Sequence, residues 1–313
     1  MLGKTAGGLF WLARYLERSE NTARLVEAGF HMALTRASIG ADEWSSILTT
    51  TDCMEAYTKR YGEINPDHVI DFLIRNRNNP LSIISSVSAA RDNARLTRTA
   101  LTREMFEAVN DAWLTLKRLF EKPITPSNLT QVLFSIRQQS AQVRGTLHGT
   151  MLRTDSYWFS RLGSMIERAD NTARILNVKY YLLLPSGTSI GSSLDNVQWE
   201  MLLRSTSAER SYNWLFTGEA NAKTIANFLL LDGRLPRSLR YCYDNIADNL
   251  LSLREAYDDE VLACQQAEDY RRYLRNQSID QLLNRGLHEF LGEFLNNNSS
   301  LSDQIQNDYR FYD

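Results

Sequence analysis

The sequence predicts an all-α fold, a helical bundle built from two tandem pseudo-equivalent repeats of six helices each. Two observations predict it. The segment at residues 17–24 returns at residues 167–174 with six of its eight positions identical. Apolar residues recur at helical spacing along the chain, and no alternating strand pattern or β-hairpin signal competes with them. We therefore expect a first repeat at residues 1–150 and a second at residues 151–313, packed together as one globular domain.

The first two helices follow from apolar spacing. Thr5 can cap a helix whose apolar side chains recur every three or four residues over residues 10–34. After Asp42, a second helix is predicted to run without a break to Gly62. It is indicated by the spacing of Trp44, Ile47, Leu48 and Tyr57.

Four further helices are predicted in the first half. Pro66 is a favoured first residue for a short helix. A longer helix at residues 81–99 follows, and residues 102–120 either continue it after a kink or form a new helix. Two prolines at residues 122–127 break the pattern, and residues 128–147 form the last helix of this half.

The second half repeats the landmarks of the first. A long helix at residues 158–184 carries the second copy of the motif. Matching residues then follow in the same order: Trp44 and Trp199, Ile47 and Leu202, Leu48 and Leu203, Tyr57 and Tyr212, Phe72 and Phe228, Pro80 and Pro236, Ser82 and Ser238. This order predicts a tandem duplication, in which two pseudo-equivalent helices can meet about an approximate two-fold axis.

Composition restricts the partners and the compartment. The 313 residues include 35 Lys and Arg against 37 Asp and Glu, a formal net charge of -2. This balance gives no reason to expect nucleic acid or an anionic membrane as partner. The three cysteines are far apart and fit a reducing compartment without disulfides, so we expect a cytoplasmic protein. The longest oily run, at residues 180–184, is too short to cross a bilayer.

The polar residues of the repeated segment share one face of their helix. At 100° per residue, the two glutamates, the asparagine and the second arginine of the first copy fall within an arc of about 100°. The residues in or beside this arc are Arg14, Glu17, Arg18, Glu20, Asn21 and Arg24. Their counterparts in the second copy are Glu167, Arg168, Asp170, Asn171 and Arg174.

Three interpretations of this face are open. It is a solvated face with weak i,i+4 ion pairs, a buried structural network, or a network that also lines a ligand or partner site. The buried network is favoured because Phe10 and Gly163 continue the arc, which suggests that another element covers it. Buried charges must be paired. The expected pairs across the pseudo-two-fold axis are Glu17 with Arg174 and Glu167 with Arg24.

Two weaker patterns accompany the motif. The first is a shorter echo of the motif and consists of Arg91, Asp92, Asn93 and Arg95. It is expected to join the same network, with a separate site as the alternative. The second is Arg237, which directly follows Pro236 and could hold an anion at a helix start. A helix that simply starts with proline is the favoured interpretation of this second pattern.

Catalytic and metal-binding patterns are weak. The four histidines have no metal-ligand spacing, and Glu17 and Glu20 lack the histidine that di-iron helices need. Arginine neighbours oppose a divalent cation at the motif. No metal and no cofactor is therefore implied, and catalytic activity of the chain on its own is not favoured.

The motifs together resemble the bacterial alpha-E family. The resemblance covers essentially the whole chain and rests on residues 14–18, 20–24, 79–80, 91–95 and 166–174. It implies an all-helical protein encoded beside, or fused to, a circularly permuted ATP-grasp ligase, often with a transglutaminase-like protease. Family members usually carry Gly-Arg before the second motif, whereas here Gly163 is followed by Ser164.

The expected function is that of a helical accessory or co-catalytic subunit. It would work with the ATP-grasp amide or peptide ligase in the synthesis or modification of a peptide-like product. One alternative is an independent small-molecule enzyme between the repeats, with Glu17 or Glu167 as general base and Arg24, Arg91 or Arg174 as carboxylate clamps. Another is an assembly scaffold, and a homodimer is compatible with the sequence.

Overall fold

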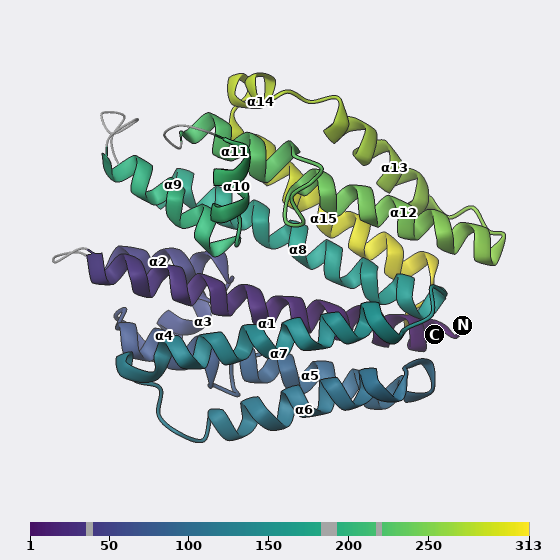
Figure 1. Cartoon of the computed structure of the whole chain (residues 1–313), viewed down its shortest axis with the longest axis horizontal. Coiled ribbons are helices and arrows are strands. Elements are labelled where there is room, and N and C mark those ends of the chain that lie inside the picture. The colour runs from purple at the N-terminus through teal and green to yellow at the C-terminus, as the bar shows by residue number, and fades with distance from the viewer. Residues whose placement is uncertain (36–39, 183–192, 217–220, 313) are drawn as a thin grey trace. The chain divides into compact units, whose positions relative to one another are not determined.

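Two compact units make up the chain (Figure 1). The computed structural model describes residues 1–35, 40–182, 193–216 and 221–312. Unit 1 comprises Met1–Ser164 with Tyr309–Asp313, and unit 2 comprises Met165–Asp308. The boundary lies inside the helix α8 (Asp155–Leu182), whose first ten residues belong to unit 1.

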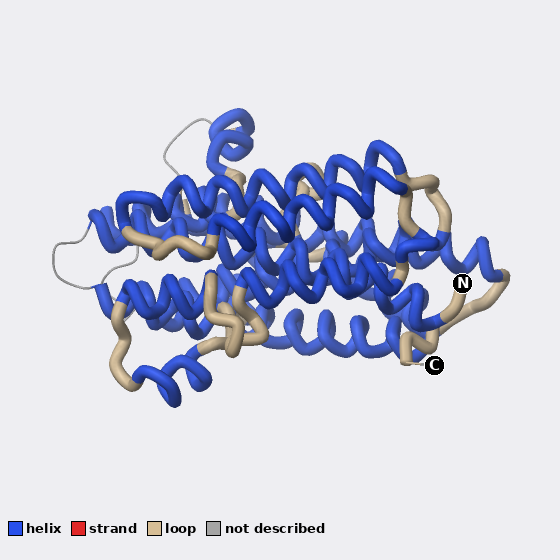
Figure 2. Tube along the Cα trace, turned by 90° about the horizontal axis from the view of Figure 1, so that it is seen from below, coloured by secondary structure: helices blue, strands red, loops and turns tan. Residues whose placement is uncertain are grey.

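The described residues form fifteen α-helices and one short 3-10 helix, and none of them forms a strand (Figure 2). The predicted all-α fold is therefore confirmed. Residues 183 and 184, predicted to end the second long helix, lie outside the described residues. No helix in the described ranges is long and apolar enough to cross a bilayer. In the described part of the chain no disulfide forms, and the three cysteines are buried: Cys53, Cys242 and Cys264.

In unit 1, four long helices run side by side around one apolar core. They are α1 (Gly3–Thr35), α5 (Ile83–Leu96), α6 (Arg103–Leu119) and α7 (Pro126–Thr150). The first of them packs against both α5 and α7. Small side chains let the backbones approach closely, and the core includes Leu12, Leu16, Ala90, Ala94, Val109 and Val143.

The start of α1 differs from the prediction. The helix begins at Gly3, so Thr5 is not its cap, and the Thr5 amide instead donates to the Leu2 carbonyl at 3.0 Å. A Cβ at Gly8 would come within 2.4 Å of Thr97 Cγ2, just past the end of α5. The glycine is therefore required by the close approach of two helices.

The second predicted helix is in fact two, α2 (Gly40–Thr50) and α3 (Met54–Tyr61). Asp52 has a left-handed φ of 58°, which ends the first helix. The hydroxyls of Thr50 and Thr51 donate to the carbonyls of Ser46 and Ile47, four residues earlier. Helical continuity to Gly62 was therefore a wrong prediction, because apolar spacing alone does not register such a break.

Side-chain caps place the remaining helix starts of unit 1. Asn65 caps α4 (Pro66–Ile74) by accepting from the His68 amide at 3.2 Å, and the predicted start at Pro66 is confirmed. Ser82 caps α5, and Thr102 caps α6. A short 3-10 helix, η1 (Arg98–Ala100), separates these two helices, and α6 packs back against α5 instead of continuing it.

The last described residues complete unit 1. The Phe311 ring lies 5.4 Å from that of Phe10 and 5.9 Å from that of Phe159, measured between centroids. A Cβ at Gly3 would lie 1.8 Å from the Arg310 carbonyl oxygen. Residues from the beginning, middle and end of the chain therefore share one packed region.

Unit 2 contains the rest of α8 and seven further helices. Its core includes Tyr243 and Phe294, and buried Asn298 ties α15 to α8 by donating to the Ile166 carbonyl at 3.1 Å. The α12 helix packs against α13, and α13 packs against α15. The helices are α9 (Ser193–Ser205), α10 (Glu209–Leu215), α11 (Ala222–Leu231), α12 (Leu239–Tyr257), α13 (Leu262–Arg275), α14 (Ile279–Arg285) and α15 (Leu287–Asp308).

Candidate functional site

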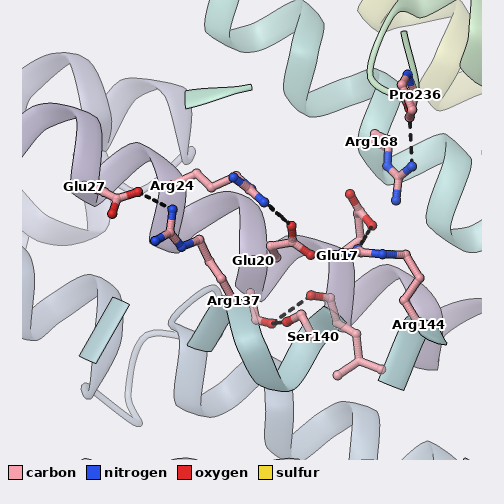
Figure 3. A network of polar contacts seen from close by, with 11 residues as sticks. Glu17, Glu20, Arg24, Glu27, Arg137, Ser140, Arg144, Arg168 and Pro236 are labelled. Carbon is pink, nitrogen blue, oxygen red and sulfur yellow. Dashed lines mark hydrogen bonds and ion pairs between the residues drawn. The ribbon is translucent and has the colours of Figure 1, made fainter. Parts of the chain in front are cut away.

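The first copy of the motif is buried and paired with α7 (Figure 3). The Glu20 carboxylate, 0% exposed, accepts from two guanidinium groups. Arg144 Nη1 lies 2.7 Å from its Oε2, and Arg24 Nη2 lies 2.6 Å from its Oε1. Glu17, also buried, lies 3.5 Å from the same nitrogen of Arg144. Two carboxylates and two cations thus neutralise one another, and a solvated face was a wrong interpretation.

Three polar side chains of α7 face α1 in a row. Arg137 Nη1 donates to Glu27 at 2.6 Å, the Ser140 hydroxyl lies 3.5 Å from that of Ser19, and Arg144 follows. Their spacing of three and four residues puts them on one side of a helix. Arg137 and Arg144 lie outside the repeated motif and were not predicted as its partners. Their helical spacing within an otherwise apolar stripe could have indicated a polar contact on this face of α7. The spacing does not indicate which helix provides the partners.

A small hollow borders Glu17 in unit 1. Its volume is about 30 Å³, which is roughly the space of one water molecule. Charged and hydroxyl side chains contribute to its wall: Glu17, Ser140, Arg144, Ser160, Arg161 and Ser164. The hollow can therefore hold a water beside the motif, but it has no room for a substrate.

His148, at the end of α7, is held between two side chains of α8. Its Nδ1 lies 2.8 Å from the Tyr157 hydroxyl, and its Nε2 lies 3.4 Å from Arg161 Nη1. A guanidinium group only donates, so Nε2 accepts and the ring proton sits on Nδ1. The histidine thus joins α7 to the first turns of α8.

The second copy of the motif holds the turn that precedes α12. Arg168, 6% exposed, donates from Nη1 to the Pro236 carbonyl at 3.3 Å (Figure 3). The Thr172 hydroxyl donates to the Arg237 carbonyl at 2.9 Å. Both contacts fix backbone rather than side chains, so the motif arginine and threonine act here as clamps on a loop.

The ends of the second copy lie in different environments. Arg174 Nε donates to Asp170 at 2.6 Å within the helix, and both side chains are partly exposed. Glu167 is buried, and Asn171 is half-buried. The pairing expected between the two copies stays a prediction.

The flanking arginines of the first copy lie over aromatic rings. The Arg14 guanidinium carbon lies 4.7 Å from the Trp11 ring centroid, and that of Arg18 lies 5.8 Å from the Tyr15 centroid. Asn21 is buried within the same helix. These contacts orient the arginines along α1.

The echo on α5 does not join the motif network. Arg91 Nε donates to Asn110 of α6 at 2.9 Å, and its guanidinium group lies over the Trp113 ring. The Asn93 amide donates to a carbonyl of its own helix. Asp92 and Arg95 are exposed. The expected membership was wrong because α5 turns its small alanines toward α1, which directs these polar residues elsewhere.

The α12 start differs from the favoured interpretation of Arg237, a helix that starts with proline. The helix begins at Leu239, beyond Pro236, and Ser238 is its cap. The Ser238 hydroxyl accepts from the Tyr241 amide at 3.0 Å and donates to the Asp232 carbonyl at 2.6 Å. A proline-first start is therefore wrong, and an anion site at Arg237 stays a prediction.

Asp232 makes this turn sensitive to acid. Hydrogen bonds from Arg234, at 2.7 and 3.0 Å, hold the pKa of the Asp232 carboxyl below its usual value. A lowered folded-state pKa stabilises the protein above the unfolded pKa of about 4, and this stabilisation is lost as the pH falls through the folded value. Asp232→Asn should lower the free energy of unfolding only slightly at pH 7, because Arg234 is largely exposed.

Urea unfolding of the wild type and Asp232→Asn between pH 7 and pH 3 measures this difference. The gap between the two unfolding midpoints should shrink below about pH 4. A gap that stays constant across the series would contradict the assignment.

The described residues contain no group of three or more His, Cys, Asp or Glu side chains arranged to hold a metal ion. Fold and site define a class: an all-α chain in which repeated Glu-Arg segments are buried among the helices. The chain belongs to the Alpha-E family, whose sequence model matches residues 1–310 and is described as a predicted alpha-helical domain with a conserved ER motif. The resemblance seen in the sequence is thus confirmed. Searches of curated proteins and of solved structures found no match.

Proposed function

We propose that this chain is a helical accessory or co-catalytic subunit of a circularly permuted ATP-grasp ligase that makes or modifies a peptide-like product. The observation that carries the proposal is the buried Glu20 carboxylate between Arg24 and Arg144, at 2.6 and 2.7 Å. A general acid or base must reach the proton that it transfers. A fully buried carboxylate held by two guanidinium groups is better suited to joining helices.

The hollow beside Glu17 supports the same proposal. Ligand sites usually have volumes of about 300 to 1,000 Å³, against about 30 Å³ here. Within unit 1 the motif therefore favours stability over turnover. The ligase would supply the chemistry, and this subunit a rigid helical surface.

The family supplies the expected partners. Resemblance to its members motivates the ATP-grasp ligase and a transglutaminase-like protease as partners in the cytoplasm, and self-association as a homodimer is part of the proposal. The near balance of 35 basic and 37 acidic residues motivates a protein partner over nucleic acid.

Co-expression with the neighbouring ligase tests the proposal. The two proteins should elute together in size-exclusion chromatography, and the ATP turnover of the ligase should change when the subunit is added. An unrelated helical protein at the same concentration is the control. Separate elution together with unchanged turnover would refute the proposal.

We also propose that the two halves derive from a tandem duplication. Corresponding helices have corresponding caps: Asn65 and Asn221 cap α4 and α11, while Ser82 and Ser238 cap α5 and α12. Both pairs are separated by 156 residues, as 221 minus 65 and 238 minus 82 show. Trp44 and its counterpart Trp199 are both buried, as are Tyr57 and Tyr212. This agreement supports repeats at residues 1–150 and 151–313.

An enzyme that uses Glu17 as general base is the second candidate. It is favoured by one observation, since Glu17 borders the hollow together with Arg144 and Arg161. Glu17→Gln separates the candidates in the reconstituted system, with Glu27→Gln, on the same helix, as control. Loss of activity in the first variant alone, with an unchanged thermal midpoint, would favour the enzyme. Loss of folding would favour the structural role.

A further inference from the structure

Unit 2 contains a groove that is much larger than the hollow beside the motif. It lies between α13 and α15, with Arg285 at the end of α14 also on its wall, and its volume is about 510 Å³. This volume falls within the range of small-molecule sites. None of the residues that line it belongs to the repeated motif, so a function for it is independent of the proposed accessory role.

Tyrosine rings form one wall of the groove. The centroid of Tyr270 lies 4.8 Å from that of Tyr243 and 5.4 Å from that of Tyr273, and successive rings are tilted by about 45°. Phe294 packs edge-on against Tyr270 from the core. Burial raises the pKa of the Tyr270 phenol, so this side chain stays neutral over the physiological range. The wall is therefore aromatic, and the buried Tyr270 in it carries no phenolate charge.

Three charged side chains lie on the groove wall. They are Asp269, Glu293 and Arg285, two acids against one base. Asp269 is paired with Arg272 on its own helix. Glu293 receives two hydrogen bonds from Arg285 Nη2, both 2.6 Å long.

The ion pair between Arg285 and Glu293 is exposed enough for another cation to replace Arg285. The two side chains are 48% and 51% exposed, and such surface pairs are weak. Arg285 also donates from Nη1 to the Tyr273 hydroxyl at 3.0 Å. The Arg285 guanidinium group thus already lies where a cation can contact both the Glu293 carboxylate and the Tyr273 hydroxyl.

We propose that this groove binds a small organic cation, an ammonium group carried on an aromatic body. The ammonium would replace Arg285 beside Glu293, and the aromatic body would lie against Tyr270 and Tyr273. Aromatic rings pack favourably against one another, and a carboxylate gives an ammonium group a charge-assisted hydrogen bond. The side-chain amide of Gln266, which makes no hydrogen bond within the described residues, is available to polar substituents.

Three probes with the same phenyl body test the proposal: phenethylammonium, 2-phenylethanol and phenylacetate. Calorimetry with the full chain should show that the cation binds at least tenfold more tightly than the neutral or anionic probe. Equal affinity for the neutral probe, or a preference for the anion, would overturn the proposal.

Two variants are expected to change the affinity for phenethylammonium in opposite directions. Glu293→Gln should weaken phenethylammonium binding at least tenfold, whereas Arg285→Gln should strengthen it several-fold because it frees Glu293. Glu255→Gln, exposed on α12 and outside the groove, is the matched control and should leave binding unchanged. Weaker binding in Arg285→Gln, or equal loss in the control, would refute the proposal. All three surface variants are expected to fold, and circular dichroism checks this.

Discussion

Replacing Arg144 with methionine is expected to lower the free energy of unfolding by about 3 kcal/mol. The change keeps the apolar stem of the side chain but removes the cation 2.7 Å from Glu20 and 3.5 Å from Glu17. Both carboxylates are buried, so they lose a partner without gaining water. Urea unfolding, followed by far-ultraviolet circular dichroism as a measure of helix content, gives the change in the free energy of unfolding.

Arg137→Met is the matched control, because Arg137 lies two turns earlier on the same helix. Its partner Glu27 has a side chain that is 20% exposed, against 1% for that of Glu20, so loss of this ion pair should cost about 1 kcal/mol or less. Arg144→Met leaves Glu17 and Glu20 with Arg24 as the described cation, so adding Glu20→Gln should recover part of the lost stability by removing the excess buried negative charge. Equal costs for the two single variants would show that burial of the motif carboxylates contributes nothing.

Gly163→Ala should destabilise unit 1 by about 3 kcal/mol. A Cβ at this position would lie 2.1 Å from the Phe10 carbonyl oxygen and 2.9 Å from its carbonyl carbon. These are backbone atoms of α1, so no rotamer change relieves the clash and the first turns of α8 must move away. Thermal unfolding of the purified variant gives the loss as a lower midpoint.

Gly145→Ala is the control of opposite sign. Gly145 lies inside α7, and an added Cβ meets no atom within 4 Å. Alanine is a better helix former, so this variant should gain about 0.5 to 1 kcal/mol. A midpoint for Gly163→Ala at or above that of the wild type would contradict the close crossing of α1 and α8.

Much of the fold follows from local patterns in the sequence. The helix start at Pro66 depends on residues close in the chain, and it was predicted correctly. Helix geometry alone places Glu17 and Glu20 on one face of their helix, so this shared face could be predicted. Because Phe10 continues that face, its burial could be predicted as well. Each of these features is settled within a few turns of one helix.

Other features depend on which helices meet. Arg144 is the main partner of Glu20, yet 124 residues separate them and nothing local links the two. Arg91 resembled the motif in sequence, but the packing of α5 directs it to Asn110. The groove around Tyr270 exists only because α13 and α15 lie together. Such pairings are tertiary contacts, and the spacing of residues within one helix does not predict them.

The return of the chain to unit 1 has a consequence for biogenesis. Phe10 and Phe159 receive the Phe311 ring only after the whole of unit 2 has been synthesised. During translation, the nascent amino-terminal helices lack the packing of the Phe311 ring and therefore expose apolar surface. We therefore expect nascent chains to recruit chaperones until Phe311 can pack against Phe10 and Phe159.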